Sequence, residues 1–549
     1  MKNSNSDNPV LEPELARSIH GWAAADPDPA AGQALSDLAA TRPAEAAALF
    51  ERRLEFGTAG LRGPLGLGPA SMNRVIVRIA ASAIAGQLTD DALVGEVVIG
   101  HDARYGSSDF ALDSARVFAA LGFQPLLIDG PTPTPVVAHL ALNRSAVAAI
   151  VVTASHNPPG DNGYKVYWND GAQIVPPIDS SIEARMGRLP LDDSELASAE
   201  TIERMSPDEA ISQYLTTVLP DLAPATAPSS PTTIVYTALH GVGAPAIRAA
   251  FDAVGLVRPV EVTSQIDPDP DFSTVELPNP EEKGALDESF RTADAAGADV
   301  ILANDPDADR LGVAVRTEAG WRKLTGDEIG CILADRLLSR NRGPNPVVAS
   351  SIVSSPWIET IATAHNAQVR RTLTGFKWII RSAIDEPELT FVFGYEEALG
   401  FACSRLVRDK DGVTAALEIA CLVHELAADG RTLIDHLDSM IERFGVAASG
   451  QVTRRYEDEP GQMVARLDEL RADPPSDLEI VETIDHLQST PATNLLEWRI
   501  GHHADRVLLR PSGTEPKLKA YLQTSGSPEE TDEVHTRLAA LQQRITELL

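Results

Sequence analysis

One pattern of apolar and polar residues occurs three times along the chain. Each copy has a short β-branched run, a polar or glycine-containing loop, a helix-forming stretch and a second short apolar run. The first runs begin at Val97, Thr233 and Pro346, the helical stretches lie near 111–121, 246–254 and 356–365, and the second runs end at Ile128, Val262 and Thr372. Repeated units of this kind predict three related α/β domains with parallel or mixed sheets and right-handed crossovers.

The two ends of the chain depart from this pattern. The first fifty residues are rich in alanine and other helix formers, and residues 57–68 then supply five glycines, which predicts helices followed by a loop. The tail has strand-like patches and a final helical stretch, as in a smaller α+β domain, at 478–484, 494–499, 506–509 and 527–549. We therefore expect four domains, at residues 1–205, 206–322, 323–445 and 446–549, with a Pro/Ala/Ser-rich connector at 223–231.

A serine is presented by the loop Thr153–Asn162, which is rich in Gly, Pro and Asn. The loop follows an apolar run, Ala146–Val152, with the composition of a buried parallel strand, and the turn residues end that strand abruptly. Loops at the carboxyl edge of such sheets are where α/β proteins bind ligands. The hydroxyl of Ser155 is therefore expected to face a ligand instead of packing in the core.

Three carboxylates follow a strand in the second unit. Asp305, Asp307 and Asp309 come soon after the strand-like run Ala298–Ala303, so alternate residues are able to converge on one side. Hard cations prefer carboxylate and phosphoryl oxygens, and Mg²⁺ is commonly shared between the two, so the trio predicts a Mg²⁺ site. The run Asp267–Asp271 has the same acid spacing but two prolines and no preceding strand, which favours a surface turn.

A third chemical motif lies in the tail, at residues 510–516. It combines a guanidinium fork, two hydroxyls and backbone N–H groups around a glycine, which together suit a phosphate dianion: Arg510, Ser512, Gly513 and Thr514. An ordinary hairpin turn with a surface arginine is the alternative. Together, the serine, the carboxylates and this loop favour phosphoryl transfer through a phosphoserine.

Three further residues are candidates for the same site. Lys165 follows Ser155 by ten residues, and desolvation and nearby cations would lower its pKa toward that of a general acid or base. Arg62 offers a similar charge, and for both residues the alternative is a solvated surface cation. His156 adjoins the serine, but adjacent side chains seldom face each other. We therefore interpret His156 as a catalytic-site residue that orients phosphate oxygens or the loop.

The charge of the chain limits its partners. With 46 basic and 79 acidic side chains the formal net charge is −33, which disfavours nucleic acid and anionic membranes because their phosphates would be repelled. A phosphorylated small molecule is compatible, because surface charge is screened within about 8 Å at physiological salt. No apolar stretch of membrane-spanning length and no signal-peptide pattern occur in the sequence, so we expect a soluble, cytoplasmic protein.

Five motifs, in this order, resemble those of the α-D-phosphohexomutase superfamily, which contains phosphoglucomutases and phosphomannomutases. They lie at Phe56–Gly63, Thr153–Asn162, Asp305–Arg310, Gly394–Gly400 and Arg510–Pro516. The resemblance spans nearly the whole chain. It implies three related α/β domains, a fourth domain resembling the TATA-binding-protein fold, and an active site in the cleft where the four meet.

The resemblance also implies a role for each matching residue. Ser155 would be the phosphoserine and would bind Mg²⁺ together with the Asp305, Asp307 and Asp309 carboxylates. Arg62 and Lys165 would assist proton transfer, and Arg310 would support the metal loop. The sugar would be contacted by Glu396, Glu397, Thr374 and Gly375, the non-reacting phosphate by Arg510, Ser512, Gly513 and Thr514, and either one by Lys410.

One position departs from many hexomutases, which carry a serine where this chain has Ala398. The surrounding Tyr395–Ala398 is similar to the branch that includes phosphopentomutases and bacterial phosphoglucomutase/phosphomannomutase enzymes. Loss of a hydroxyl donor weakens strict discrimination between hexoses and other sugars.

The function expected from these motifs is interconversion of the 1- and 6-phosphates of glucose and/or mannose. It would proceed through a phosphoserine and a sugar bisphosphate, with a sugar 1,6-bisphosphate as activator. A phosphopentomutase acting on ribose phosphates and a transferase that forms glucose 1,6-bisphosphate are the alternatives. A non-catalytic phosphosugar sensor is less consistent with a nucleophilic serine beside three carboxylates. The sequence does not predict the oligomeric state.

Overall fold

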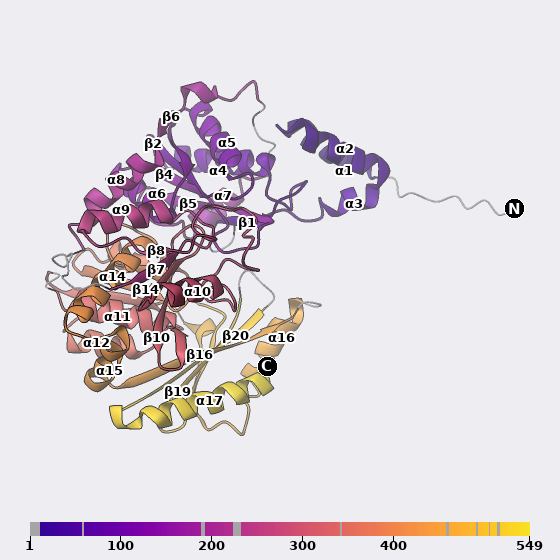
Figure 1. The fold of residues 1–549 in the computed structure, drawn as a ribbon. Coiled ribbons are helices and arrows are strands. Elements are labelled where there is room, and N and C mark those ends of the chain that lie inside the picture. The colour runs from indigo at the N-terminus through magenta and orange to yellow at the C-terminus, as the bar shows by residue number, and fades with distance from the viewer. Residues whose placement is uncertain are drawn as a thin grey trace.

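The computed structural model describes residues 11–56, 60–187, 191, 193–222, 232–340, 343–456, 460–489, 492–503, 505–512 and 517–549. Four sheets follow one another along these residues (Figure 1). The first sheet lies at the top of the view and the fourth at the bottom. The predicted connector, 223–231, and residues 57–59 of the first motif lie outside the described residues.

Three helices confirm the predicted helical start. They are α1 (Pro13–Ala25), α2 (Pro29–Thr41) and α3 (Pro43–Ala48). Each begins with a proline, whose fixed φ suits the first helical position and whose missing N–H costs no helical hydrogen bond there. Ile19 and Leu35 are fully buried in an apolar core that these helices share with the first sheet. The N-terminal helices are therefore packed onto the first α/β domain.

The first sheet has the strand order β1-β5-β4-β2-β3-β6. Its strands are β1 (Leu61–Pro64), β2 (Glu96–His101), β3 (Gln124–Pro131), β4 (Ala148–Val152), β5 (Asp161–Trp168) and β6 (Glu203–Met205). The associated helices are α4 (Arg74–Asp90), α5 (Ser107–Ala120), α6 (Thr134–Asn143) and α7 (Ile178–Glu183). β4, β2, β3 and β6 are parallel, while β5 and β1 form an antiparallel edge. The loop predicted over residues 57–68 is wrong in part, because β1 pairs with β5 as a strand.

The second sheet has the order β11-β10-β9-β7-β8. Its strands are β7 (Ile234–Thr237), β8 (Val260–Glu261), β9 (Val300–Asn304), β10 (Leu311–Thr317) and β11 (Gly320–Lys323). Its helices are α9 (Ala244–Val254) and α10 (Asp287–Ala296), and α8 (Pro207–Val218) packs against both α9 and α6 of the first domain. β7 is parallel to β8 and β9, whereas β10 is antiparallel to β9.

The third sheet has the order β13-β12-β14-β15. Its strands are β12 (Pro346–Ser351), β13 (Gln368–Thr372), β14 (Thr390–Glu396) and β15 (Gly400–Ala402). Its helices are α11 (Gly326–Leu338), α12 (Trp357–Ala364), α13 (Phe376–Ile379), α14 (Gly412–Ala428) and α15 (Leu433–Phe444). The three predicted strand–helix–strand repeats are therefore confirmed as three mixed α/β sheets.

The fourth sheet is entirely antiparallel, in the order β16-β20-β19-β18-β17. Its strands are β16 (Val446–Arg455), β17 (Ile480–Asp485), β18 (Leu496–Ile500), β19 (Asp505–Pro511) and β20 (Lys517–Gly526). Its helices are α16 (Pro460–Ala472) and α17 (Thr531–Leu548). The three predicted strands and the final helix are confirmed, while β16, α16 and β20 were not predicted.

Burial distinguishes the fourth domain from the other three. One continuous apolar core joins the first three sheets and includes the fully buried Val151, Leu302 and Phe393. The fourth sheet has a core of its own around Trp498 and Leu522. Burial of apolar surface is the main force that holds such layers together. The first three domains therefore form one packed body, and a small apolar cluster joins the fourth domain to the third.

Candidate active site

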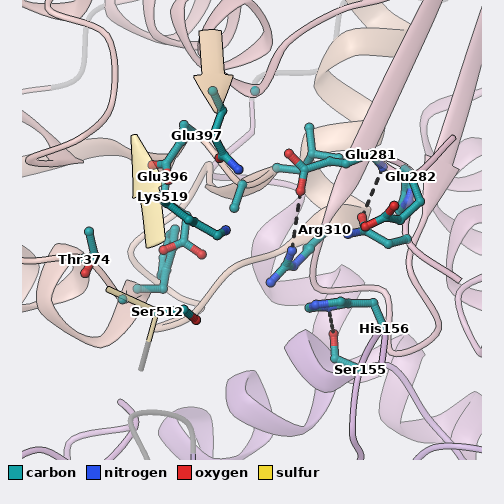
Figure 2. Close-up of a pocket in the computed structure, with 18 of the residues that line it drawn as sticks. Ser155, His156, Glu281, Glu282, Arg310, Thr374, Glu396, Glu397, Ser512 and Lys519 are labelled. Atoms are coloured by element: carbon teal, nitrogen blue, oxygen red, sulfur yellow. Dashed lines mark hydrogen bonds and ion pairs between the residues drawn. The ribbon is translucent and has the colours of Figure 1, made fainter. Parts of the chain in front are cut away.

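A cleft of about 1860 Å³ is lined by residues of all four domains. Figure 2 shows Ser155, His156 and Arg310 on one side of it and Thr374, Glu396, Ser512 and Lys519 on the other. The sequence-predicted residues that line the cleft are Arg62, Ser155, His156, Lys165, Asp309, Arg310, Thr374, Gly375, Glu396, Glu397, Lys410, Arg510 and Ser512. Gly513 and Thr514 lie outside the described residues.

Ser155 lies in a short loop after β4, as predicted from the end of the apolar run. Its φ of 52° is in the left-handed region, which is uncommon for a residue with a side chain. The Thr153 hydroxyl accepts the Ser155 N–H at 2.8 Å, and the Ser155 hydroxyl donates to Asp305 Oδ2 at 2.6 Å. Segments 150 residues apart therefore place an alcohol oxygen directly against one of the three predicted metal ligands.

The three aspartates converge just beyond the carboxyl end of β9. One oxygen from each of Asp305, Asp307 and Asp309 lies within 4.8 Å of the other two, and all three side chains are buried. Asp307 Oδ1 and Asp309 Oδ1 are buried without a hydrogen-bond partner among the described residues. Buried carboxylate oxygens are costly unless a donor or a cation faces them. The trio therefore has the donor chemistry of a site for a hard divalent cation such as Mg²⁺.

The loop that carries the trio is fixed by neighbouring residues. Arg310 donates its backbone N–H to Asp305 Oδ1 at 3.0 Å, and its guanidinium Nε lies 4.0 Å from Asp309 Oδ1. Gly241 packs so closely below the loop that a Cβ there would lie 2.3 Å from Pro306, so a larger residue would displace the backbone. Arg310 thus supports the loop and also presents its charge to the cleft.

Two carboxyl groups of the trio have pKa values shifted in opposite directions. Burial next to Asp307 and Asp309 raises the pKa of Asp305 to about 8. Burial also acts to raise the pKa of Asp307, but Lys165 outweighs it and holds that pKa below its usual range. The like charges thus act on Asp305 and the lysine on Asp307, and a bound cation would favour the ionised form of both.

Lys165 lies on β5 and its ammonium group faces the trio. Its Nζ donates to Asp307 Oδ2 at 2.7 Å and to Asp309 Oδ2 at 2.6 Å. Burial would lower the pKa of Lys165, but the two carboxylates outweigh burial and raise it. The predicted lowering of this pKa is therefore wrong, because the two carboxylates outweigh both burial and the nearby cation Lys410. In this arrangement Lys165 is a fixed positive charge.

His156 and Arg62 lie on the same side of the cleft as Ser155. His156 Nδ1 lies 3.2 Å from Ser155 Oγ, so the expectation that these adjacent side chains do not meet is wrong (Figure 2). Burial, together with Arg310 and Arg62, lowers the pKa of His156 well below its ordinary value. Arg62 lies on β1 and donates to Asn157 Oδ1 at 3.1 Å, within the serine loop. A neutral imidazole and a cation therefore flank the serine.

The opposite side of the cleft carries a pair of acidic residues where β14 ends. Glu397 Oε2 accepts hydrogen bonds from the hydroxyls of Ser351 at 2.9 Å and Ser354 at 3.2 Å. Burial and the neighbouring Glu396 raise the pKa of Glu397 to about 7. Glu396, the other member of the pair, lines the cleft and is half-buried. Its carboxylate is thus available to accept hydrogen bonds from a polar ligand.

Lys410 connects the two sides. Its Nζ lies 3.2 Å from Asp309 Oδ2 and 3.4 Å from Asp409 Oδ1. The ammonium group also lies 5.6 Å from the centroid of the Phe376 ring, next to the loop of Thr374. A lysine in this position supplies positive charge to the trio and to any anion held nearby.

Sequence reasoning missed several residues that line the cleft, among them the charged residues Lys519 and Glu281. Lys519 on β20 lies opposite Arg510 of β19 in the sheet register and also lines the cleft. The sequence feature that could have revealed Lys519 is the alternation Lys517-Leu518-Lys519, because in a strand it places both lysines on one face.

Glu281 is the second of these charged residues and comes from the second domain. Its Oε2 lies 4.0 Å from Arg310 Nη1 (Figure 2), and burial raises its pKa. Lys323 holds the segment in place, since its Nζ donates to the carbonyl oxygens of Pro280, Glu281 and Glu282 at 2.8 to 3.2 Å. No strand or spacing in the sequence marked this loop.

Comparison with known protein families agrees with this architecture. Four domain descriptions of one family match in order: phosphoglucomutase/phosphomannomutase alpha/beta/alpha domains I, II and III and the C-terminal domain, at residues 53–191, 212–320, 325–444 and 498–541. The chain therefore belongs to the phosphoglucomutase/phosphomannomutase family, within the α-D-phosphohexomutase superfamily. The predicted fold and superfamily are both confirmed.

Individual relatives differ in the substrate that their names give. The chain is 38% identical to a probable phosphomannomutase of Haemophilus influenzae, over 84% of this chain and 95% of the relative. It is 32% identical to a probable phosphoribomutase of Schizosaccharomyces pombe, over 94% of each chain. A solved structure of a putative phosphomannomutase from Thermus thermophilus shares the fold with a TM-score of 0.67 and 23% identity, covering 89% of this chain and 99% of that one.

These findings establish the class of reaction. The protein is an enzyme, an intramolecular phosphotransferase of the phosphomutase type. Its trio of buried aspartates forms a site with the ligands for a metal ion. Among the described residues, no helix is long and apolar enough to cross a membrane.

Proposed function

We propose that the protein interconverts the 1-phosphate and the 6-phosphate of a hexose, glucose and/or mannose, with Ser155 as the phosphoryl carrier. The observation that carries this proposal is the contact of 2.6 Å between Ser155 Oγ and Asp305, at the edge of a cleft lined by four domains. A nucleophilic oxygen beside three carboxylates and a set of cations is the arrangement that phosphoryl transfer requires.

Two half-reactions account for the isomerisation. Phosphorylated Ser155 donates its phosphoryl group to the free hydroxyl of a sugar monophosphate, so the serine P–O bond breaks, a sugar P–O bond forms and the sugar hydroxyl loses its proton. The resulting bisphosphate turns around in the cleft. Its other phosphate then returns to Ser155, and the isomeric monophosphate leaves. A sugar 1,6-bisphosphate would activate the enzyme by phosphorylating the free serine.

Positive charge surrounds the reacting side. Lys165, Arg62 and Arg310 all line the cleft near the serine, and fixed cations stabilise the spread negative charge of a transferring phosphoryl group. Asp305, Asp307 and Asp309 would hold Mg²⁺, which would supply further charge neutralisation there. His156, held neutral at 3.2 Å from the serine oxygen, is placed to orient phosphoryl oxygens or to accept a proton.

The opposite side of the cleft would hold the rest of the substrate. Glu396 and Glu397 would accept hydrogen bonds from sugar hydroxyls, with Thr374 and Gly375 beside them. Arg510, Ser512, Gly513 and Thr514 would hold the non-reacting phosphate, and Lys519 adds a cation opposite Arg510. A clamp on a separate domain suits a bisphosphate that must present either end to the serine.

A pentose phosphate is the second candidate substrate. Ala398 supplies no hydroxyl to the sugar loop, and one relative is named as a probable phosphoribomutase. A comparison of turnover decides between the hexose and the pentose substrate. It uses glucose 1-phosphate, mannose 1-phosphate and ribose 1-phosphate at equal concentration, with a trace of glucose 1,6-bisphosphate. We expect one of the hexoses to have the highest kcat/KM. A higher kcat/KM for ribose 1-phosphate would replace the hexose proposal with the pentose one.

The same assay tests the transferase alternative. An enzyme whose product is glucose 1,6-bisphosphate would accumulate bisphosphate from a second phosphoryl donor without isomerising the monophosphate. We further propose that the substrate is a free small molecule in the cytoplasm. The net charge of −33 disfavours nucleic-acid and anionic-membrane partners.

A further inference from the structure

One buried arginine holds the serine loop in its conformation. Arg104 lies three residues after β2 and is only 4% exposed. Its Nη2 donates to the carbonyl oxygens of Ser155 at 2.6 Å and Asn157 at 2.5 Å. Its Nη1 donates to those of Pro158 at 2.7 Å and Asp161 at 3.1 Å. Four carbonyl groups of one loop therefore converge on a single guanidinium.

The serine loop needs such support because its backbone is strained. Ser155 has the left-handed φ of 52°, a conformation that persists for a residue with a side chain only when the surroundings fix it. Four carbonyl dipoles pointing to one place would also repel each other without a cation between them. The planar fork of arginine, with several N–H donors, satisfies all four at once, which the single ammonium of a lysine does not.

Arg104 is itself fixed on the side away from the loop. Asp102 Oδ1 accepts the backbone N–H of Arg104 at 3.0 Å and the Ser107 hydroxyl at 2.6 Å. Asp102 Oδ2 lies 3.4 Å from Arg104 Nε. The guanidinium is thus anchored to the start of α5 in the first domain.

The second domain packs against the same guanidinium. The Arg104 Cζ atom lies 4.8 Å from the centroid of the Phe272 ring, a cation–π contact, and Phe272 is only 2% exposed. Beside it, the Tyr105 hydroxyl donates to Asp271 Oδ2 at 3.0 Å. Phe272 directly follows the turn Asp267–Asp271 and belongs to the domain that carries the aspartate trio. Arg104 therefore contacts the serine loop and the metal-loop domain at once.

We propose that Arg104 is a positioning residue that, with Phe272, sets the place of Ser155 Oγ relative to Asp305 across the boundary between the first two domains. This inference rests on the proposed role of Ser155 as the phosphoryl carrier. Arg104 is absent from the residues that line the cleft, and its terminal nitrogens are engaged by carbonyl groups. It acts on the reaction through the backbone of the serine loop and through the contact between the domains.

The substitution Arg104→Lys keeps the charge and removes the fork. We expect kcat to fall about 30- to 100-fold, because a misplacement of about 1 Å costs a catalytic group that much. KM for the hexose phosphate should stay within about threefold, since the sugar contacts come from the third and fourth domains. Arg116→Lys is the matched control, because Arg116 also donates to a carbonyl oxygen, that of Ala197 at 2.9 Å, and should leave kcat unchanged.

The substitution Phe272→Leu tests the contact between the domains. We expect kcat to fall about fivefold, the size of one cation–π contact. Phe290→Leu is the control, because that ring stacks on Trp321 of the same domain, with 6.1 Å between the ring centroids. In the double variant R104K/F272L, the loss should be close to that of R104K alone, because both substitutions act through the same placement of the serine loop against the second domain.

A transient kinetic measurement distinguishes a positioning role of Arg104 from a purely structural one. After mixing with glucose 1,6-bisphosphate, the rate at which Ser155 gains phosphate is followed by intact mass, alongside the thermal midpoint of each variant. Slower phosphorylation in R104K, measured at a temperature well below its thermal midpoint, supports the proposal. A folded R104K with wild-type phosphorylation and kcat, or independent losses that multiply in the double variant, would overturn it.

Two outcomes separate this inference from the proposed function. An active Ser155→Ala variant would contradict both the phosphoserine and the proposed role of Arg104. An inactive Ser155→Ala variant together with a fully active R104K variant would contradict only the proposed role of Arg104. If R104K does not fold, Phe272→Leu decides, and an unchanged kcat in that variant contradicts the proposal.

Discussion

The two sides of the cleft are built in different ways. On the side of the cleft that carries Ser155, the side chains of Ser155, Lys165 and the aspartate trio are buried. Hydrogen bonds of 2.6 to 2.7 Å hold each of them. On the side proposed to bind the sugar, Thr374 and Glu396 are only half-buried. The same holds for Arg510 and Ser512, the described residues of the proposed phosphate clamp.

We interpret this difference as a separation between the residues that carry out phosphoryl transfer and those that recognise the sugar. Buried polar groups that satisfy one another form a fixed electrostatic environment, which stabilises a transferring phosphoryl group without reorganisation during the reaction. Half-buried groups keep hydrogen-bonding capacity for a ligand, so their contribution depends on which hydroxyls the sugar presents. Substitutions on the reacting side should therefore slow every substrate equally, while substitutions on the sugar side should change the order of preference.

The largest effect is expected at the serine. Ser155→Ala removes the proposed nucleophile, and kcat should fall by about a thousandfold or more with every sugar phosphate, since the loss of a nucleophile is usually that severe. Steady-state assays with hexose and ribose 1-phosphates measure the fall. Activity within about tenfold of wild type would reject Ser155 as the carrier.

The next effect is expected at the carboxylate that accepts the serine hydroxyl. Asp305→Asn removes one of the three carboxyl groups that would hold the cation, and kcat should fall about 100-fold, by the same factor for hexose and pentose phosphates. Asp267→Asn, in the exposed turn with the same acid spacing, is the control and should be active. Unequal losses among the sugars would place Asp305 in recognition and contradict the division between the two sides.

A smaller and selective effect is expected at Glu396. Glu396→Gln keeps the size of the side chain but replaces one acceptor oxygen with a donor, so kcat/KM for the preferred hexose should fall about tenfold. The fall for ribose 1-phosphate should be different, because a pentose presents its hydroxyls in another arrangement. Equal losses for all three sugars would show that Glu396 serves the reaction and not recognition.

The smallest effect concerns stability and pH at Glu397. Its pKa is raised from 4.5 to about 7 by burial and Glu396, so the protonated form stabilises the folded state. That contribution is complete below about pH 4.5 and is lost as pH rises through 7. Glu397→Gln cannot ionise and should lose less stability than wild type between pH 5 and pH 8.

Urea unfolding at the two pH values measures this difference, and groups common to both proteins cancel in the comparison. Glu388→Gln, at an exposed position of the same domain, should behave as wild type. An identical change with pH in E397Q and wild type would show that Glu397 is not held in its protonated form.

The sequence predicted the parts of the molecule that depend on local pattern. The β-branched runs marked the central parallel strands, and strand ends marked the loops of Ser155 and Asp305. Parts that depend on pairing across the chain were not predictable: β1 lies in a glycine-rich stretch and becomes a strand only because β5 lies beside it. β20 begins directly after the phosphate loop, where no separate apolar run announced a strand.

The same holds for the electrostatics of the site: local residue types were predictable, but the effects of distant partners were not. The residue types of the trio predicted their chemistry, but the pKa of Lys165 was predicted in the wrong direction because its partners lie 142 and 144 residues away. Arg104 was missed because a lone arginine after a strand resembles a surface residue. Only the folded chain shows that four carbonyl groups of the serine loop surround it.

Mass analysis of the protein after incubation with glucose 1,6-bisphosphate tests the central claim most directly. We expect wild type to gain one phosphate, located on the peptide that contains Ser155, and to pass it to added glucose 6-phosphate or glucose 1-phosphate. The Ser155→Ala variant should gain none. A phosphate on any other residue, or none on a wild-type enzyme that still turns over, would contradict the claim.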